Sequence, residues 1–224
     1  IKMENKLVIT NDGSHSIFNP IINECYHSKH GAIVEAEHVF IRNGFSALNK
    51  EKLNILEVGF GTGLNALLTY QKAEQKLIEV NYQTMELYPV NKENYMQLNF
   101  TDLIGLKHEK LLNLHSCTWE VKHKISSYFT LTKNHTSLEN FNTNLQFDII
   151  YFDAFSPEKQ PELWNKHIFK KMHGFLKDDG FLVTYCAKGV VKRTMKAVGF
   201  EVIVLDGPPG KRQMTRGNQS VIEK

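Results

Sequence analysis

The sequence contains no apolar run of about 18 residues, so we expect no membrane-spanning helix. Its first ten residues lack the long apolar core of a secretory signal, and Met3 is a candidate initiator. Cysteine is scarce: Cys25, Cys117 and Cys186 form an odd, widely spaced set, which excludes a disulfide framework and a paired-cysteine metal site. These absences favour a protein that works in the reducing cytoplasm, away from the membrane.

A large excess of one charge is also lacking, because the 224 residues carry a formal net charge of only +3. An apolar share of 42% and a charged share of 23% exclude disordered, collagen-like and coiled-coil classes. The charge is nevertheless uneven, since residues 186–217 include seven basic and two acidic side chains. This basic segment indicates either a polyanionic partner or a solvated lysine-rich helix face, and the charge pattern alone leaves both open.

Short apolar runs alternate with amphipathic segments from residue 53 onward. The runs predict strands at 53–58, 81–87, 147–153, 181–186 and 201–205. The amphipathic segments predict helices at 63–75, 89–98, 161–176 and 187–200, with a turn at Asp179-Gly180. This alternation predicts an α/β fold with a mostly parallel, doubly wound sheet and helices on both faces, whose ligands lie where the strand order reverses.

The first 45 residues have a different pattern. Segments 6–10 and 16–20 flank Asn11-Asp12-Gly13, which suits a hairpin turn because Asp and Gly tolerate positive φ. Residues 31–42 have helical spacing before a stop at Asn43-Gly44. We therefore expect an N-terminal extension over residues 1–45, made of a hairpin and a helix, and a main domain over residues 46–224.

A glycine-rich turn follows the first core strand, with Gly59, Gly61 and Gly63 at alternate positions in the segment GFGTGLN. Glycine lets the backbone turn tightly and approach a ligand without a Cβ clash. Together with Glu57, the turn resembles the E/D-x-G-x-G-x-G loop of class I S-adenosylmethionine (SAM) methyltransferases. It also satisfies the relaxed dinucleotide pattern G-x-G-x-x-A, which ends at Ala66, and a turn without a ligand is the plain alternative.

Glu86 closes the second core strand. An acid about 20 residues beyond a glycine loop binds ribose hydroxyls in nucleotide-binding sheets, because a carboxylate accepts two hydrogen bonds at once. This position therefore favours a nucleoside-containing ligand, without deciding between NAD and SAM. A surface glutamate at a strand end is the plain alternative.

The third motif is Asp153-Ala-Phe-Ser-Pro157, after the buried strand. It resembles the loop that amino-methyltransferases place beside the SAM methyl group. A target amine with a pKa of about 10 arrives protonated, so the site must hold its N–H groups, aim its lone pair and stabilise its charge. Since an ordinary carboxylate is a weak base toward an ammonium ion, we expect Asp153 to orient the amine and stabilise charge rather than abstract the proton. The plain alternative is an aspartate that caps the helix near Pro161.

Residues 153–164, DAFSPEKQPELW, resemble the signature D-[AG]-F-[AS]-P-x-K-x-P-[ED]-[ML]-W of a bacterial family of tRNA wobble-uridine methyltransferases. That family comprises the methyltransferase half of the bifunctional MnmC enzymes and the stand-alone MnmD proteins. The segment GFGTGLN is similar to the family's own, and residues 210–214, GKRQM, resemble its G-x-K-R-E-M. Further counterparts lie in the same order: Asp12-Gly-Ser14, Glu35, His38-Val-Phe40 and Gly189-Val-Val-Lys-Arg193.

The resemblance implies a class I SAM methyltransferase that converts 5-aminomethyl-(2-thio)uridine at the tRNA wobble position to its methylaminomethyl form. It implies that Asp153 lies at the reacting amine and that SAM contacts Glu57, Gly59, Phe60, Gly61, Gly63, Asn65 and Glu86. Substrate contacts, including phosphates of the anticodon region, are expected from Glu35, Phe155, Ser156, Pro157, Lys188, Lys192, Arg193, Lys211 and Arg212. Tyr26, Phe45 or Phe155 can stack on the uridine.

The chain has no room for the flavin oxidase half of the bifunctional enzymes, so we expect no FAD and no metal. The aminomethyl precursor must then come from other enzymes, to which the protein is functionally coupled. Two departures from the family pattern stand out. Ala36 replaces the usual Ser after the glutamate, and no clear Asp follows the third strand for the adenine amine, where Asn134 or Glu139 can stand instead.

Two other classes remain as alternatives. One is an NAD-dependent Rossmann oxidoreductase, against which the absence of a Tyr-x-x-x-Lys or comparable hydride-transfer set argues. The other is a non-catalytic RNA-binding protein on a SAM fold. The ten histidines form no HExxH or Cys/His cluster, and no GxSxG nucleophile motif occurs.

Overall fold

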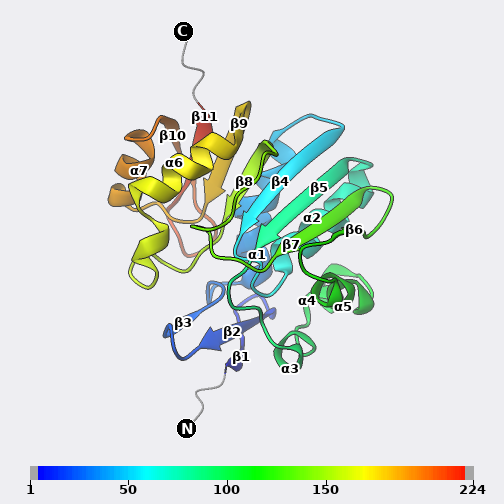
Figure 1. Cartoon of the computed structure of the whole chain (residues 1–224). Helices are drawn as coiled ribbons and strands as arrows, with labels where there is room; N and C mark the ends of the chain where they lie inside the picture. The colour runs from blue at the N-terminus through cyan, green and yellow to red at the C-terminus, as the bar shows by residue number, and fades with distance from the viewer. Residues whose placement is uncertain (1–4, 220–224) are drawn as a thin grey trace.

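The computed structural model describes residues 5–219, and its centre is an eight-stranded sheet (Figure 1). In spatial order the strands are β10 (Phe200–Asp206), β11 (Gln213–Gln219), β9 (Leu176–Thr184), β8 (Phe147–Phe152), β4 (Lys52–Val58), β5 (Glu79–Met85), β7 (Phe129–Asn134) and β6 (Lys122–Lys124). The five strands from β9 to β7 are parallel, whereas β11 lies antiparallel between β9 and β10 and β6 is antiparallel to β7.

The strand order reverses beside β4. From β4 the chain adds β5 and β7 on one side and then crosses to add β8 and β9 on the other side. Loops that leave the carboxyl ends of β4 and β8 therefore diverge and open a crevice between them, which is where a doubly wound sheet binds its ligands.

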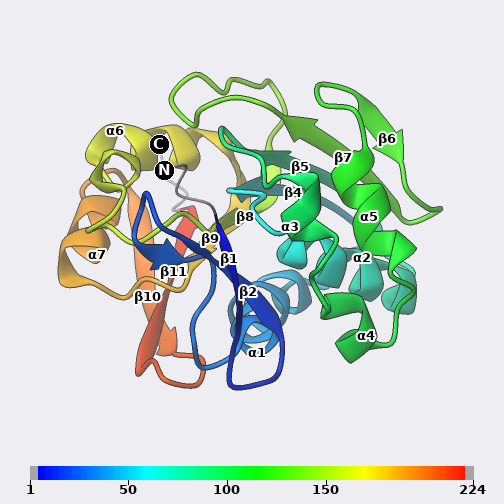
Figure 2. The same ribbon diagram turned by 90° about the horizontal axis from the view of Figure 1, so that it is seen from below.

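Helices cover both faces of the sheet (Figures 1 and 2). One face packs against α1 (Ala32–Ala36), α2 (Leu64–Lys76) and α5 (Glu109–Ser116), and the other against α6 (Lys166–Phe175) and α7 (Gly189–Lys196). Alternate residues of a strand serve the two faces: Ile55 and Tyr151 belong to the first core, whereas Leu56 and Phe152 belong to the second. Because both faces are covered, all six residues of β8 are buried, as its continuous apolar run predicts.

A small antiparallel sheet of β1 (Lys6–Ile9), β2 (His15–Asn19) and β3 (Glu24–Cys25) lies at the carboxyl ends of the central strands (Figure 2). The predicted hairpin turn is present, and Asp12 stabilises it. Its Oδ1 accepts the Ser14 N–H at 2.9 Å, while its Oδ2 accepts the Val34 N–H at 3.0 Å and so ties the turn to α1. A π-helix, η1 (Glu37–Arg42), continues α1 and ends at Asn43, near the predicted stop.

The α/β fold class and the mostly parallel sheet are confirmed, and three local predictions are wrong. The predicted helix 89–98 shrinks to α3 (Lys92–Tyr95), because the Asn91 side chain accepts the Asn94 N–H and starts the helix there. The predicted helix 161–176 divides into η3 (Pro161–Leu163) and α6, because Asn165 caps the second part through the Ile168 N–H. Asp179-Gly180 lies within an irregular part of β9, not in a turn before it.

The segment without a clear pattern contains α4 (Phe100–Ile104), α5, β6 and β7, and η2 (Phe45–Ala47) precedes the central sheet. Strand β11, which completes the sheet between β9 and β10, was not predicted. Within residues 5–219, no helix has both the length and the apolar character needed to cross a membrane.

Candidate active site

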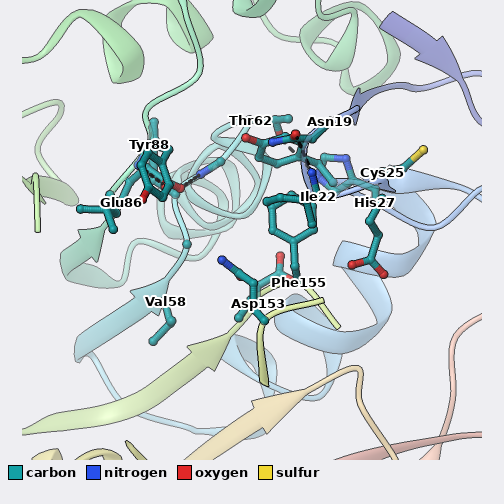
Figure 3. A pocket seen from close by; sticks show the side chains of 18 of the residues that line it. Asn19, Ile22, Cys25, His27, Val58, Thr62, Glu86, Tyr88, Asp153 and Phe155 are labelled. Carbon is teal, nitrogen blue, oxygen red and sulfur yellow. Dashed lines mark hydrogen bonds between the residues drawn. The ribbon is translucent and has the colours of Figure 1, made fainter. Parts of the chain in front are cut away.

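A cleft of about 1510 Å³ opens where the strand order reverses (Figure 3). The glycine turn after β4, Glu86 after β5 and Asp153 after β8 all line it, and the N-terminal sheet supplies the facing wall. Figure 3 shows Glu86 and Tyr88 on one side of the cavity, His27 and Cys25 on the other, and Asp153 with Phe155 between them. The glycine turn and Asp153, about 90 residues apart in the sequence, thus share one cavity, as methyl transfer to an amine held by Asp153 requires.

The glycine turn has a backbone that only glycine adopts readily. Gly59, Gly61 and Gly63 have φ values of +87°, +49° and +75°. A Cβ on Gly59 would lie 2.8 Å from the Asp153 carbonyl oxygen, and one on Gly61 would lie 3.0 Å from the Tyr26 ring. The turn is therefore packed tightly against both the Asp153 loop and the N-terminal sheet.

Glu86 is held by two backbone groups. Its Oε2 accepts the Gly61 N–H at 3.0 Å and its Oε1 accepts the Tyr88 N–H at 2.8 Å. Burial raises the pKa of Glu86, and these backbone hydrogen bonds oppose that shift. Each carboxylate oxygen keeps a second lone pair, so the group can still accept hydrogen bonds from a diol in the cleft.

Asp153 is the titratable group at the centre of the cleft. Its Oδ2 accepts a hydrogen bond of 2.8 Å from the Asn65 amide. Burial raises the pKa of Asp153 to about 7, with a further increase from the charge of Glu35 and opposing effects of Asn65 and Lys211. The premise that this carboxyl has an ordinary low pKa is therefore wrong, and Asp153 is basic enough to accept a proton near neutral pH.

The loop after Asp153 is fixed from three directions. The Ala154 carbonyl accepts the Tyr185 hydroxyl at 2.9 Å, and the Phe155 carbonyl accepts the Trp164 indole N–H at 2.8 Å. Glu24 of β3 accepts both the N–H and the hydroxyl of Ser156 at 3.1 Å. The Phe155 ring meets the edge of Tyr26 at 4.9 Å between centroids, so these two rings form one aromatic wall.

A charged pair stands beside Asp153. The Lys211 ammonium lies 2.5 Å from Glu35 Oε2 and 4.0 Å from the centroid of the Tyr185 ring. All three residues line the cleft. A carboxylate and an aromatic face that already bind one ammonium group form a corner suited to cations.

Not every expected site residue reaches the cleft. Ten of the expected residues line it: Glu35, Gly59, Phe60, Gly61, Asn65, Glu86, Asp153, Phe155, Ser156 and Lys211. The expected residues that do not line it are Glu57, Gly63, Pro157, Lys188, Lys192, Arg193 and Arg212. Of the basic ones, Lys188 is paired with Glu158.

Glu57 lies fully buried beneath the glycine turn. Neither of its carboxyl oxygens has a hydrogen-bond partner of good geometry among residues 5–219. Burial raises the pKa of Glu57 well above its usual value, and the charge of Asp153 adds to this shift. Glu57 is not among the residues that line the cleft, so it supports the turn from below.

Only some of the candidate residues for binding adenine and for stacking on the uridine line the cleft. Glu139 lines the cleft, whereas Asn134 does not line it and donates its side-chain amide to the Thr84 carbonyl at 2.9 Å. Phe45 is a core residue at 1% exposure, whereas Tyr26 lines the cleft. Sequence reasoning missed the contribution of Asn19, Ile22 and His27, because nothing in the local pattern of the hairpin shows where it packs.

The strand order and the place of the cleft are those of the class I SAM-dependent methyltransferase fold. Residues 112–220 match a family model described as S-adenosyl-L-methionine-dependent methyltransferase, which implies SAM as the methyl donor. The residues present suit this molecule: a glycine turn that leaves no room for a Cβ, a carboxylate with free lone pairs after the second strand, and a cleft large enough for a nucleoside.

Individual proteins similar to this chain indicate a more specific relationship. The tRNA 5-methylaminomethyl-2-thiouridine biosynthesis bifunctional protein MnmC of Cupriavidus metallidurans is 30% identical over 93% of this chain and 33% of its own length. The protein of the same name from Burkholderia thailandensis is 29% identical over 94% of this chain and 34% of its own length. The crystal structure of MNMC2 from Aquifex aeolicus has a TM-score of 0.79 at 22% identity and covers 98% of this chain and 71% of that chain.

The resemblance predicted from the motifs is therefore confirmed, and this chain is related to the MnmC proteins over nearly its whole length. It spans about a third of the length of these curated relatives. The structural likeness confirms the fold.

Proposed function

We propose that this protein transfers the methyl group of SAM to the primary amine of 5-aminomethyl-(2-thio)uridine at the wobble position of tRNA. The observation that carries the proposal is the common cleft of the glycine turn and Asp153. The names of the MnmC relatives support the substrate, because they refer to biosynthesis of 5-methylaminomethyl-2-thiouridine in tRNA.

The chemistry requires a neutral amine. An aliphatic amine has a pKa of about 10 in water, so it enters mostly as an ammonium ion without a free lone pair. Asp153, with its pKa raised to about 7, accepts one proton from this nitrogen and keeps its lone pair aimed at the donor. SAM supplies an electrophilic methyl group on a sulfonium. The new N–C bond forms as the S–C bond breaks, and the electron pair of the broken bond stays on sulfur.

The donor is held on the glycine-turn side of the cleft. Gly59, Phe60, Gly61 and Asn65 contact its amino-acid part, and Glu86 accepts hydrogen bonds from its ribose hydroxyls. Glu57 and Gly63 support the turn without contact. Glu139, which lines the cleft, is the acid that we assign to the adenine amine, in place of the Asp that the family usually has.

The uridine enters against the aromatic wall of Tyr26 and Phe155, and its amine reaches the carboxylates of Asp153 and Glu35. Flipping a base out costs little in a single-stranded anticodon loop. Lys188, Lys192, Arg193 and Arg212 lie outside the cleft, so their role is to contact phosphates, while Pro157 shapes the loop. Three free cysteines suit a reducing cytoplasm as the place of the reaction.

The test is mass spectrometry of nucleosides from tRNA that carries the aminomethyl precursor, after incubation with the purified protein and methyl-labelled SAM. We expect labelled 5-methylaminomethyl-(2-thio)uridine, and none from tRNA that lacks the precursor. Unlabelled tRNA together with nicotinamide-dependent turnover would favour the oxidoreductase alternative. Tight tRNA binding without any labelling would favour the non-catalytic one.

A further inference from the structure

Thr62, in the middle of the glycine turn, is held by two histidines from different parts of the chain. Its carbonyl accepts the Nε2–H of His115, from α5, at 2.9 Å. Its hydroxyl lies 3.1 Å from Nε2 of His27, which follows the N-terminal strand β3 and lines the opposite wall of the cleft (Figure 3). The N-terminal sheet is thus bonded directly to the turn that is proposed to hold the methyl donor.

The direction of these hydrogen bonds follows from counting donors and acceptors. Ser16 Oγ accepts the backbone N–H of His27 at 3.1 Å and lies 3.1 Å from Nδ1 of the same histidine. Ser16 is fully buried, and the imidazole Nδ1 is the available acceptor for its hydroxyl hydrogen within residues 5–219. A buried hydroxyl that donates nothing is costly, so Ser16 donates to Nδ1.

The hydrogen bond from Ser16 to His27 determines the direction of the next one, between His27 and Thr62. With Nδ1 as an acceptor, the neutral ring carries its hydrogen on Nε2 and donates it to Thr62 Oγ1. Burial lowers the pKa of His27 to about 4, so the ring remains neutral at physiological pH. The hydroxyl hydrogen of Thr62 is then left over, and Thr62 lines the cleft.

From this arrangement we infer that His27 is a positioning residue that turns the Thr62 hydroxyl into a hydrogen-bond donor aimed at an acceptor-only group in the cleft. This identification rests on the proposed function: the acceptor-only group is the carboxylate of the methyl donor. Thr62 lies just before the N-terminal end of α2, where the helix dipole also favours a negative charge.

The first experiment compares two ligands by isothermal titration calorimetry: S-adenosylhomocysteine, which has the carboxylate, and 5′-methylthioadenosine, which lacks the amino-acid part. We expect Thr62→Val to weaken S-adenosylhomocysteine binding about tenfold and to leave 5′-methylthioadenosine binding within about twofold. Thr62→Ser keeps the hydroxyl and is expected to bind both ligands nearly as the parent does. Equal losses for both ligands would overturn the assignment of the carboxylate.

The second experiment asks whether His27 acts through Thr62. We expect His27→Phe to reproduce the selective loss for S-adenosylhomocysteine, His27→Gln to restore part of it through its amide N–H, and His27→Phe to add little when Thr62 is already valine. Additive effects of the two substitutions would contradict the inference. Since His27→Phe can also impair folding, ¹⁵N NMR of the parent protein gives an independent test: a proton on Nδ1 of His27 instead of Nε2 would refute it.

These outcomes are separate from the fate of the proposed function. If the parent protein binds neither ligand, the proposed function and the inference fail together. If it binds S-adenosylhomocysteine and the Thr62 and His27 variants bind it equally well, the inference alone fails.

Discussion

Asn65 and Asp153 are joined by a hydrogen bond of 2.8 Å from amide to carboxylate, although 88 residues separate them in the sequence. Asn65 belongs to the first turn of α2, directly after the glycine turn, and Asp153 follows β8. The bond therefore couples the part of the cleft proposed for the methyl donor to the group proposed to meet the amine. It also favours the ionised form of Asp153 and so limits how far burial raises the pKa of that carboxyl.

Asp153→Asn is expected to reduce kcat for tRNA methylation by about a hundredfold or more, because an amide cannot accept the proton of the amine. In the parent protein, kcat/KM is expected to rise with pH through about 7, where the pKa of Asp153 lies, and then to level off. Both are measured by labelled methyl transfer between pH 5.5 and 9. Asp179→Asn, an exposed aspartate paired with Lys50, serves as the control and should leave the profile unchanged.

Asp153→Asn is also expected to stabilise the fold at alkaline pH. The pKa of Asp153 is about 7 in the folded protein and about 4 in the unfolded chain, so ionisation costs the folded state free energy above pH 7 and nothing below pH 4. Asp153→Asn should therefore raise the free energy of unfolding by up to about 4 kcal/mol at pH 8, and the gain should shrink as the pH falls from 7 and vanish near pH 4. Urea unfolding at the two pH values measures it, and a gain of equal size at pH 4 would show that another cause is at work.

The glycine turn and the Asp153 loop could be predicted because each is local: a buried strand, then a short segment whose residue types fit one task. The same locality explains why the central strands were found and β11 was not. Strand β11 pairs antiparallel with β9 and β10, and its sequence, QMTRGNQ, has few apolar residues. Its place depends on its neighbours in the sheet and not on its own pattern.

The rest of the cleft depends on contacts that no local pattern contains. Lys211 meets Glu35 across 176 residues, and Glu24 meets Ser156 across 132. His27 and Tyr26 join the site because the N-terminal sheet packs over the carboxyl ends of the central strands. The raised pKa of Asp153 is likewise a consequence of burial, so the sequence could name the residue but could not give its basicity.

Glu86→Gln is expected to weaken S-adenosylhomocysteine binding by about tenfold, because it replaces a charged acceptor of two backbone N–H groups with an amide that accepts only one of them well. Calorimetry measures the affinity directly. Glu79→Gln is the matched control, since Glu79 begins the same strand at its opposite, exposed end and is paired with Lys52. Unaltered affinity in Glu86→Gln would remove this residue from the proposed donor site.

The double variant Arg193→Ala and Arg212→Ala is expected to weaken tRNA binding and to reduce its dependence on salt, with a slope of log affinity against log salt smaller by about 2. Both residues are exposed and outside the cleft, so S-adenosylhomocysteine affinity should not change. Filter binding at several salt concentrations gives the slope. Lys122→Ala, on the far edge strand β6, is the control, and an equal effect there would indicate a diffuse charge effect rather than a defined contact.

Two glycine substitutions are expected to have opposite effects. Gly59→Ala places a Cβ 2.8 Å from the Asp153 carbonyl at a φ of +87°, so we expect it to lower the free energy of unfolding by about 2 kcal/mol or more and to abolish S-adenosylhomocysteine binding. Gly174→Ala, within α6, meets nothing within 4 Å and should raise the free energy of unfolding by up to about 1 kcal/mol, because alanine favours the helix. Urea unfolding and calorimetry of both variants provide the comparison. A Gly59→Ala protein that binds the ligand normally would show that the turn moves away from Asp153 without loss, and the close packing of these two segments would then have no part in holding the donor.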